Sequence, residues 1–260
     1  MWIISIIHLF IIILFLINYL KRIVFLFFMV KKIVIMAAGK GIRMLPLTRY
    51  VPKVLVNING RPFLYYVMKN ILKAGYDDIA IIVGYKREKI KEFLDEFGFK
   101  ARLIYQKKRL GTGHALKQVK AFAKDDNFVV ICGDNLWSAR DLKATKNFNK
   151  FCYISGMEHP SPGNYGVLIE EKGLLKKIVE KPKSFVGNMI NVGLYKFTSE
   201  IFDALDNIKK SERGEYELTD AISFLAEQGK VKIITLKDYW LDLGSLDDIP
   251  KVEQFLKGRK

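Results

Sequence analysis

Apolar and polar residues alternate in blocks along the chain, and the blocks predict strands and helices in turn. Short β-branched runs bounded by small or charged residues are typical of buried strands, and amphipathic stretches are typical of helices. Up to about residue 134 we expect strands at 32–36, 78–83, 101–106 and 127–133, and helices at 62–75, 87–98 and 114–123. Alternation of strand and helix at this spacing predicts a parallel, doubly wound sheet.

The pattern changes after residue 150, where strand-like segments follow one another with short turns. We expect strands at 151–157, 165–170, 174–180, 189–197 and 231–236, and helices near 200–205, 217–230 and 246–257. No linker rich in Pro, Gly or Ser divides the chain, so residues 29–260 are expected to form one domain. The expected fold class is α/β: a Rossmann-like doubly wound mixed sheet, with an insertion-rich second half that forms a lid on it.

The first 28 residues form a separate, apolar leader. Crossing a bilayer takes about 20 apolar residues, and residues 2–20 nearly reach this length before Lys21 and Arg22. The leader lacks the basic start and the small-residue cleavage site of a secretory signal, and if it spans, the cations after it place the rest in the cytoplasm. Alternatively the protein begins at Met29, since MVKKIVIMAAGKG reads as a protein start. We favour an extension that folding does not require, on a cytoplasmic protein.

The chain is strongly basic, with a formal net charge of +16 from 43 basic and 27 acidic residues. Such an excess suits nucleic acid, anionic lipid or a polyanionic small substrate. No interleaving of aromatic and basic residues supports nucleic acid, which we do not expect as a partner. The informative feature is local, because no Asp or Glu precedes Asp77. Cys132 and Cys152 match neither a metal spacing nor a disulfide framework, and we expect two buried thiols.

A loop without acidic residues follows the first predicted strand, in the stretch MAAGKGIRMLPLTRYVPKVL at 36–55. A Walker P-loop is excluded because Lys40 is followed by Gly41 and not by Ser or Thr. A dinucleotide fingerprint is excluded because Met44 replaces the third glycine and no acid follows about 20 residues later. A cradle of backbone amides with nearby cations remains, which is suited to a triphosphate.

This loop resembles a known signature. GKGIRM followed by PKVL is similar to the motif of the sugar-1-phosphate nucleotidyltransferases, closest to the N-acetylglucosamine-1-phosphate uridylyltransferase and glucose-1-phosphate thymidylyltransferase groups, although Ile42 replaces the usual Thr or Ser. Further family motifs follow in order over about 32–250: YQKKRLGTGHAL, VVICGDN, NYGVLIE, KKIVEKPK, MINVGLY, GEYELTD and YWLDLGS. The resemblance implies transfer of a nucleotidyl group from an NTP, with UTP or dTTP favoured, to a sugar-1-phosphate. NDP-sugar and pyrophosphate are the products.

The resemblance also implies roles for individual residues. Arg43 and Lys53 would be catalytic; the nucleotide would bind Ala38, Gly39, Gly41, Gln106, Gly111 and Thr112; the sugar phosphate would bind Gly166, Glu180, Lys181 and Asn191; and Mg²⁺ would bind Asp134 and Asp242. Gln106 can donate and accept at once, which suits the imide edge of uracil or thymine. His114 is expected near the start of a helix, in a structural role. The phosphate oxygen of the sugar is already ionised, so the reaction needs no general base.

Other functions stay open at this point. A cytidylyl- or guanylyltransferase of the same fold, acting on another phosphorylated acceptor, would use a related loop. A catalytically silent regulatory subunit would keep the fold but should have lost Lys53, Asp134 or Asp242, and all three are present. The expected partners are the two small-molecule substrates, and a homo-oligomer is compatible with the sequence. No hexapeptide repeats follow the last predicted helix, so the acetyltransferase arm of bifunctional relatives is not expected.

Overall fold

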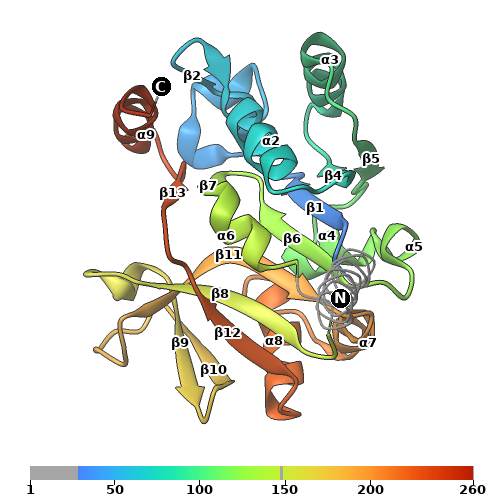
Figure 1. Ribbon diagram of the computed structural model, residues 1–260, viewed down its shortest axis with the longest axis vertical. Coiled ribbons are helices and arrows are strands. Elements are labelled where there is room, and N and C mark those ends of the chain that lie inside the picture. Colours follow the sequence, from blue (N-terminus) through green and yellow to red (C-terminus); the bar gives the residue numbers. More distant parts are fainter. Residues whose placement is uncertain (1–28, 147–148, 260) are drawn as a thin grey trace, which may run out of the picture.

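The computed structural model describes residues 29–146 and 149–259, which fold around a nine-stranded sheet (Figure 1). The strands of this sheet are β1 (Lys32–Ala37), β4 (Asp78–Val83), β5 (Arg102–Tyr105), β6 (Phe128–Cys132), β8 (Cys152–Glu158), β9 (Gly166–Glu171), β10 (Leu174–Glu180), β11 (Met189–Phe197) and β12 (Val231–Thr235). Their spatial order is β10-β9-β11-β6-β1-β4-β5, with β8 on β11 and β12 on β8. Two short ladders lie outside it: β2 (Asn57–Ile58) with β3 (Arg61–Pro62), and β7 (Asn135–Trp137) with β13 (Trp240–Asp242).

The helices of the described residues cover both faces of the sheet. They are α2 (Phe63–Lys73), α3 (Arg87–Phe97), α4 (Thr112–Lys117), α5 (Lys120–Ala123), α6 (Ala139–Ala144), α7 (Glu200–Asn207), α8 (Leu218–Glu227) and α9 (Asp248–Lys257). Strand β1 shows why helices are needed on both faces. Ile33 and Ile35 pack on the face covered by α2, α3, α6 and α9, and Val34 packs on the face covered by α4, α5, α7 and α8. Successive strand residues point to opposite faces, so an apolar run is buried on both.

The first half of the sheet is parallel and the second half is not. Strand β1 pairs in parallel with β4 and β6, and β4 pairs in parallel with β5. Strand β11 then adds to β6 in the antiparallel direction, and the register of β11 against β8 shifts between Asn191 and Tyr195, where Gly193 has a positive φ of 71°. The second half of the chain therefore continues the same sheet. The expected doubly wound mixed α/β fold is confirmed.

Some local expectations were wrong. The stretch 114–123 is not one helix, because the N–H groups of Gln118 and Val119 bond to carbonyls three residues back, on Ala115 and Leu116, and this tightening ends α4 before α5 begins. The short elements β7, α6 and β13 were not predicted, since their few residues carry no period of their own. A helix long and apolar enough for a bilayer is absent from the described residues, and the expectation for 1–28 lies outside them.

Candidate active site

The parallel strands end at one edge of the sheet, and the segments that follow them meet there. Strand β1 leads into Ala38, β5 leads into Gln106 and β6 leads into Asp134. Hydrogen bonds extend the ladders past the strand ends, with the Gln106 N–H donating to Val83 O and the Gly133 N–H to Met36 O, each at 2.9 Å. Ligands of open α/β sheets bind at this edge.

A cavity of about 590 Å³ opens at this edge. Of the residues expected to form the site, its walls contain Ala38, Gly39, Gly41, Arg43, Lys53, Gln106, Gly111, Thr112 and Asp134. Lys40, Arg109 and Glu215 also line it, and the sequence patterns had assigned them no clear role. The phosphate, base and metal residues expected from separate motifs thus share one cavity, apart from Asp242.

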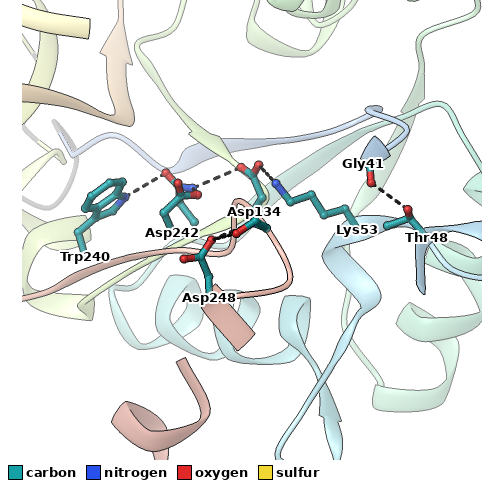
Figure 2. Close-up of polar contacts among 9 residues, drawn as sticks. Gly41, Thr48, Lys53, Asp134, Trp240, Asp242 and Asp248 are labelled. Carbon is teal, nitrogen blue, oxygen red and sulfur yellow. Dashed lines mark hydrogen bonds and ion pairs between the residues drawn. The ribbon is translucent and has the colours of Figure 1, made fainter. Parts of the chain in front are cut away.

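Thr48, seven residues after Gly41 in the sequence, helps to shape the glycine loop. Gly41 has φ 63° and ψ 41°, the left-handed region that favours glycine, and a Cβ there would lie 2.9 Å from both Lys53 Cβ and Thr48 Cγ2. Thr48, 1% exposed, donates from Oγ1 to the Gly41 carbonyl at 2.8 Å (Figure 2). Ile42 lines the cavity and is 69% exposed. Because its side chain has no hydroxyl, the loop presents only backbone groups to the cavity at this position.

Lys53 and Asp134 form an ion pair in the wall of the cavity. The distance between Lys53 Nζ and Asp134 Oδ2 is 2.7 Å, and the side chains are 11% and 31% exposed (Figure 2). Pro52, in an extended conformation with φ −57° and ψ 147°, directs the chain into the short 3₁₀ turn Lys53–Leu55. Arg43 lies in an earlier 3₁₀ turn, Ile42–Met44, and makes no ion pair with another described residue. Among the described residues of the cavity wall, Lys53 is therefore a paired cation, whereas Arg43, like Lys40 and Arg109, is in no ion pair.

Asp242 reaches this region through the ladder of β7 and β13, which places it opposite Asn135. Asn135 donates from Nδ2 to Asp242 Oδ1 at 2.8 Å, and its Oδ1 accepts from Trp240 Nε1 at 3.0 Å. The Leu243 N–H also donates to the carbonyl of Asp134 at 2.9 Å. Asn135 thus orients Asp242 beside Asp134. Sequence reasoning did not assign Asn135 a role, although it directly follows Asp134 in the GDN motif.

The two aspartates repel each other. Burial, and after it the negative charge of Asp134, together raise the pKa of Asp242 to about 6, against the opposite effects of Lys53 and Arg43. A cation between two such carboxylates would relieve the repulsion. The described residues contain no group of three or more His, Cys, Asp or Glu placed to hold a metal. A pair of carboxylates nevertheless fits Mg²⁺, which commonly takes one or two carboxylates together with phosphate oxygens and water.

The part of the cavity wall formed by Gln106, Gly111 and Thr112, where the base is expected, is held by contacts between the LGTGHA and GEYELTD motifs. The Gly113 N–H donates to Tyr216 O and the Tyr216 N–H to Leu110 O, both at 2.8 Å, which ties the LGTGHA and GEYELTD segments together. Gly111 has φ 102°, and a Cβ there would lie 2.5 Å from Tyr216 O. The Thr112 hydroxyl accepts from the Leu218 N–H at the start of α8, at 2.9 Å. Thr112 therefore has a structural contact in addition to its place in the cavity wall.

Gln106 is buried in this part of the wall, with 4% exposure. Its Nε2 lies 3.2 Å from Gly111 O and 3.0 Å from His114 Nδ1. In the structure the amide nitrogen therefore has two internal partners, whereas no described residue donates to Oε1; the expected pairing of this side chain with a base stays a prediction.

The residues expected to bind the sugar phosphate lie apart from the cavity walls. Gly166 and Glu180 are paired across β9 and β10, and a Cβ on Gly166 would lie 2.9 Å from Glu180 Oε2. Asn191 donates to the Tyr195 hydroxyl at 3.0 Å and accepts from the Gly193 N–H at 3.1 Å, so its amide already has partners. Lys181 follows β10 with φ 43°.

A ring contact joins this second region to Asp242. Tyr165, directly before β9, meets Trp240 edge to face with 5.7 Å between ring centroids. Trp240 begins the strand that ends at Asp242. The β9–β11 segment is therefore connected to the carboxylate end of the site.

Comparisons with known proteins show the family of the chain. Over 221 residues the chain is 39% identical to the bifunctional protein GlmU of Methanococcus maripaludis (strain C7), a match that covers 83% of this chain and 52% of that protein. Over 215 residues it is 38% identical to a bifunctional sugar-1-phosphate nucleotidylyltransferase/acetyltransferase of Sulfurisphaera tokodaii, with shares of 82% and 52%. The chain thus spans about half the length of these curated relatives.

The fold has solved counterparts. The structure of a UDP-glucose pyrophosphorylase complexed with UDP-glucose matches with a TM-score of 0.79, over 89% of this chain and 100% of that one, at 24% sequence identity. At this identity the likeness shows the fold alone. The family model described as nucleotidyl transferase matches residues 32–259, nearly the whole described part of the chain. The resemblance seen in the sequence motifs is confirmed, and the chain belongs to the nucleotidyl transferase family.

Proposed function

We propose that the chain transfers a uridylyl or thymidylyl group from UTP or dTTP to a sugar-1-phosphate and releases pyrophosphate. One observation carries the proposal: the glycine loop, the Lys53–Asp134 ion pair and the buried Gln106 border a single cavity. One relative supports the substrate class by its name, the bifunctional sugar-1-phosphate nucleotidylyltransferase/acetyltransferase of Sulfurisphaera tokodaii.

In the proposed reaction, an ionised oxygen of the sugar phosphate attacks the α-phosphorus of the triphosphate. The bond from the α-phosphorus to the oxygen that bridges to the β-phosphate breaks, and pyrophosphate leaves with the electron pair. The protein must bring two anions together, align them and stabilise the growing negative charge. Arg43, Lys53 and the backbone amides near Gly39 and Gly41 would do this, because they lie in the cavity wall and carry positive charge or N–H groups.

Asp134 and Asp242 would hold Mg²⁺, and Asn135 would orient Asp242 through its 2.8 Å hydrogen bond. When bound, the ion would neutralise charge on the phosphates of the substrates. Lys53 would then have a phosphate oxygen as an alternative partner to Asp134. The ion pair in the structure fits this role, because it keeps the ammonium group at the cavity wall with little freedom.

The remaining residues would select the base and the acceptor. Gln106 would accept a hydrogen bond from a base through Oε1, with Gly111 and Thr112 beside it in the wall. Gly166, Glu180, Lys181 and Asn191 would bind the sugar phosphate on the β9–β11 side. The ring contact between Tyr165 and Trp240 supports this assignment, because it joins that side to Asp242.

The test is pyrophosphate release by the full chain with Mg²⁺, across five triphosphates (UTP, dTTP, CTP, ATP and GTP) and two acceptors (glucose-1-phosphate and N-acetylglucosamine-1-phosphate). We expect release that requires an acceptor and is fastest with UTP or dTTP. A preference for CTP or GTP would transfer the proposal to a cytidylyl- or guanylyltransferase. No release with any pair, from a chain that binds triphosphate, would instead support a silent binding subunit.

A further inference from the structure

We infer that His114 is a positioning residue for base selection: it holds the Gln106 amide in the orientation that presents Oε1, a hydrogen-bond acceptor, to the nucleotide base. The sequence patterns had left His114 with a structural role only. This inference deepens the proposed function and rests on it. It attributes the selectivity for a base with an N–H at position 3 to the contact between Gln106 and His114.

The orientation of Gln106 follows from its first neighbour. The carbonyl of Gly111 can only accept a hydrogen bond, and Gln106 Nε2 lies 3.2 Å from it. The end of the amide that faces Gly111 must therefore be the NH₂ group. The Gln106 backbone is itself held by a 2.9 Å hydrogen bond to Val83 O, and the side chain is buried, so it has little room to turn.

The state of the histidine follows from its contact with the same nitrogen. Gln106 Nε2 lies 3.0 Å from His114 Nδ1, and the second N–H of the amide points to this ring nitrogen. A donor needs an acceptor, so Nδ1 must carry no proton and the ring must be neutral with its proton on Nε2. Burial and the charges of Lys117 and Lys108 lower the pKa of His114, which favours the neutral ring.

One polar atom of Gln106 remains for a ligand. Within the described part of the chain no group donates to Oε1, and this oxygen is not among the polar atoms sealed from solvent without a partner. Gln106 contributes to the wall of the cavity. Two acceptors, the Gly111 carbonyl and His114 Nδ1, thus hold the NH₂ end of the amide, and Oε1 is left to accept a hydrogen bond from a ligand.

This orientation discriminates between bases. Uracil and thymine carry an N–H at position 3, which Oε1 can accept, whereas cytosine carries a lone pair there. A lone pair against a lone pair leaves a buried acceptor unpaired, and that costs more than the loss of an apolar contact. If Nδ1 of His114 could not accept, only the 3.2 Å contact with the Gly111 carbonyl would hold the amide; the NH₂ group would turn to the base more often, and the penalty against cytosine would fall.

The test compares two variants of the full chain, His114→Leu and His114→Asn. Leucine is of similar size and has no acceptor, while asparagine carries an oxygen on its γ-carbon, where histidine has Nδ1. The readout is the ratio of kcat/KM for UTP to that for CTP with one sugar-1-phosphate. We expect His114→Leu to lower this ratio roughly tenfold or more, and His114→Asn to keep it within about threefold. A purely structural residue would change stability and both rates together, and not the ratio.

A second measurement does not depend on turnover. The ¹⁵N shifts of the His114 ring at neutral pH, assigned by loss of the signal in His114→Asn, report which nitrogen carries the proton. We expect the Nε2–H form. A proton on Nδ1, or a ratio unchanged in His114→Leu, would overturn the inference even where the enzyme is a uridylyltransferase. If no triphosphate is turned over, the proposed function fails by itself, and the ring tautomer alone then decides whether Gln106 is held as inferred.

Discussion

Lys53 Nζ lies 2.7 Å from Asp134 Oδ2, and this ion pair joins the loop after β1 to the end of β6. The two residues come from motifs that are far apart in the sequence. Lys53 follows the glycine loop, and Asp134 follows the central strand next to β1. The pair thus marks the place where the proposed triphosphate and Mg²⁺ sites adjoin.

The first prediction concerns this lysine. Lys53→Met should lower kcat roughly 10²- to 10³-fold, the usual loss when one donor to a developing negative charge is removed. Lys40→Met is the matched control, because Lys40 lines the same cavity and is exposed. The fall in kcat of Lys40→Met, measured by steady-state kinetics, should be much smaller than that of Lys53→Met. An equal or larger loss in Lys40→Met would place the important charge on the glycine loop and not on Lys53.

The second prediction concerns pH. Because the pKa of Asp242 is raised to about 6 in the folded protein, the folded state binds more protons than the unfolded state between about pH 4 and 6. The stability due to this group is therefore present below the unfolded pKa and is lost as the pH rises through about 6. Without Mg²⁺, the free energy of unfolding should fall across this window by on the order of 2 kcal/mol more in the wild type than in Asp242→Asn.

Denaturant unfolding of both proteins at pH 4 and pH 6.5 measures this difference. Activity should follow the opposite course and rise with pH through about 6, because Mg²⁺ binds the ionised carboxylate. Equal changes in unfolding free energy in the wild type and in Asp242→Asn would show that Asp242 titrates normally.

The third prediction separates Mg²⁺ binding from general stability. Asn135→Ala removes the amide that orients Asp242, so the Mg²⁺ concentration for half-maximal rate should rise roughly 10- to 100-fold. Asn127→Ala is the control: Asn127 is also 7% exposed and also donates from its amide, to Asn149 O at 2.8 Å. Asn127→Ala should lower the free energy of unfolding but leave the Mg²⁺ concentration for half-maximal rate unchanged. A Mg²⁺ titration in which both variants behave alike would rule out the orienting role.

The fourth prediction concerns the shape of the glycine loop. Thr48→Val keeps the volume but removes the hydroxyl that bonds to the Gly41 carbonyl, so KM for the triphosphate should rise several-fold and stability should fall by about 1 kcal/mol. Thr48→Ser keeps the hydroxyl and should retain the KM despite the lost methyl group. If Ser raises KM as much as Val does, packing of the methyl group and not the hydrogen bond shapes the loop.

The parallel strands of the sheet could be predicted from the sequence. The apolar run at 78–83 coincides with β4, and the run at 32–36 falls one residue short of β1, because buried parallel strands leave continuous β-branched stretches. The motif around Lys53 and the motif around Asp134 each follow such a strand, so their meeting could be expected from the position of strand ends in parallel sheets.

The finer parts of the site depend on pairings that leave no local pattern. The ladder of β7 and β13 has three residues on each strand and joins positions about a hundred apart, and it alone brings Asn135 to Asp242. The contact of Gln106 with His114 arises from the turn at Gly111, which no periodicity marks. The roles of Gly166, Glu180, Lys181 and Asn191 stay predictions.

The central claim is that the acceptor of the nucleotidyl group is a sugar phosphate, and the fate of the α-phosphorus tests it most directly. UTP labelled at the α-phosphorus is incubated with the full chain, Mg²⁺ and either glucose-1-phosphate or N-acetylglucosamine-1-phosphate, and the products are separated. We predict label in UDP-sugar, in an amount equal to the pyrophosphate released, and only when an acceptor is present. Label recovered as UMP, with pyrophosphate formed equally fast without acceptor, would make water the acceptor and contradict the claim.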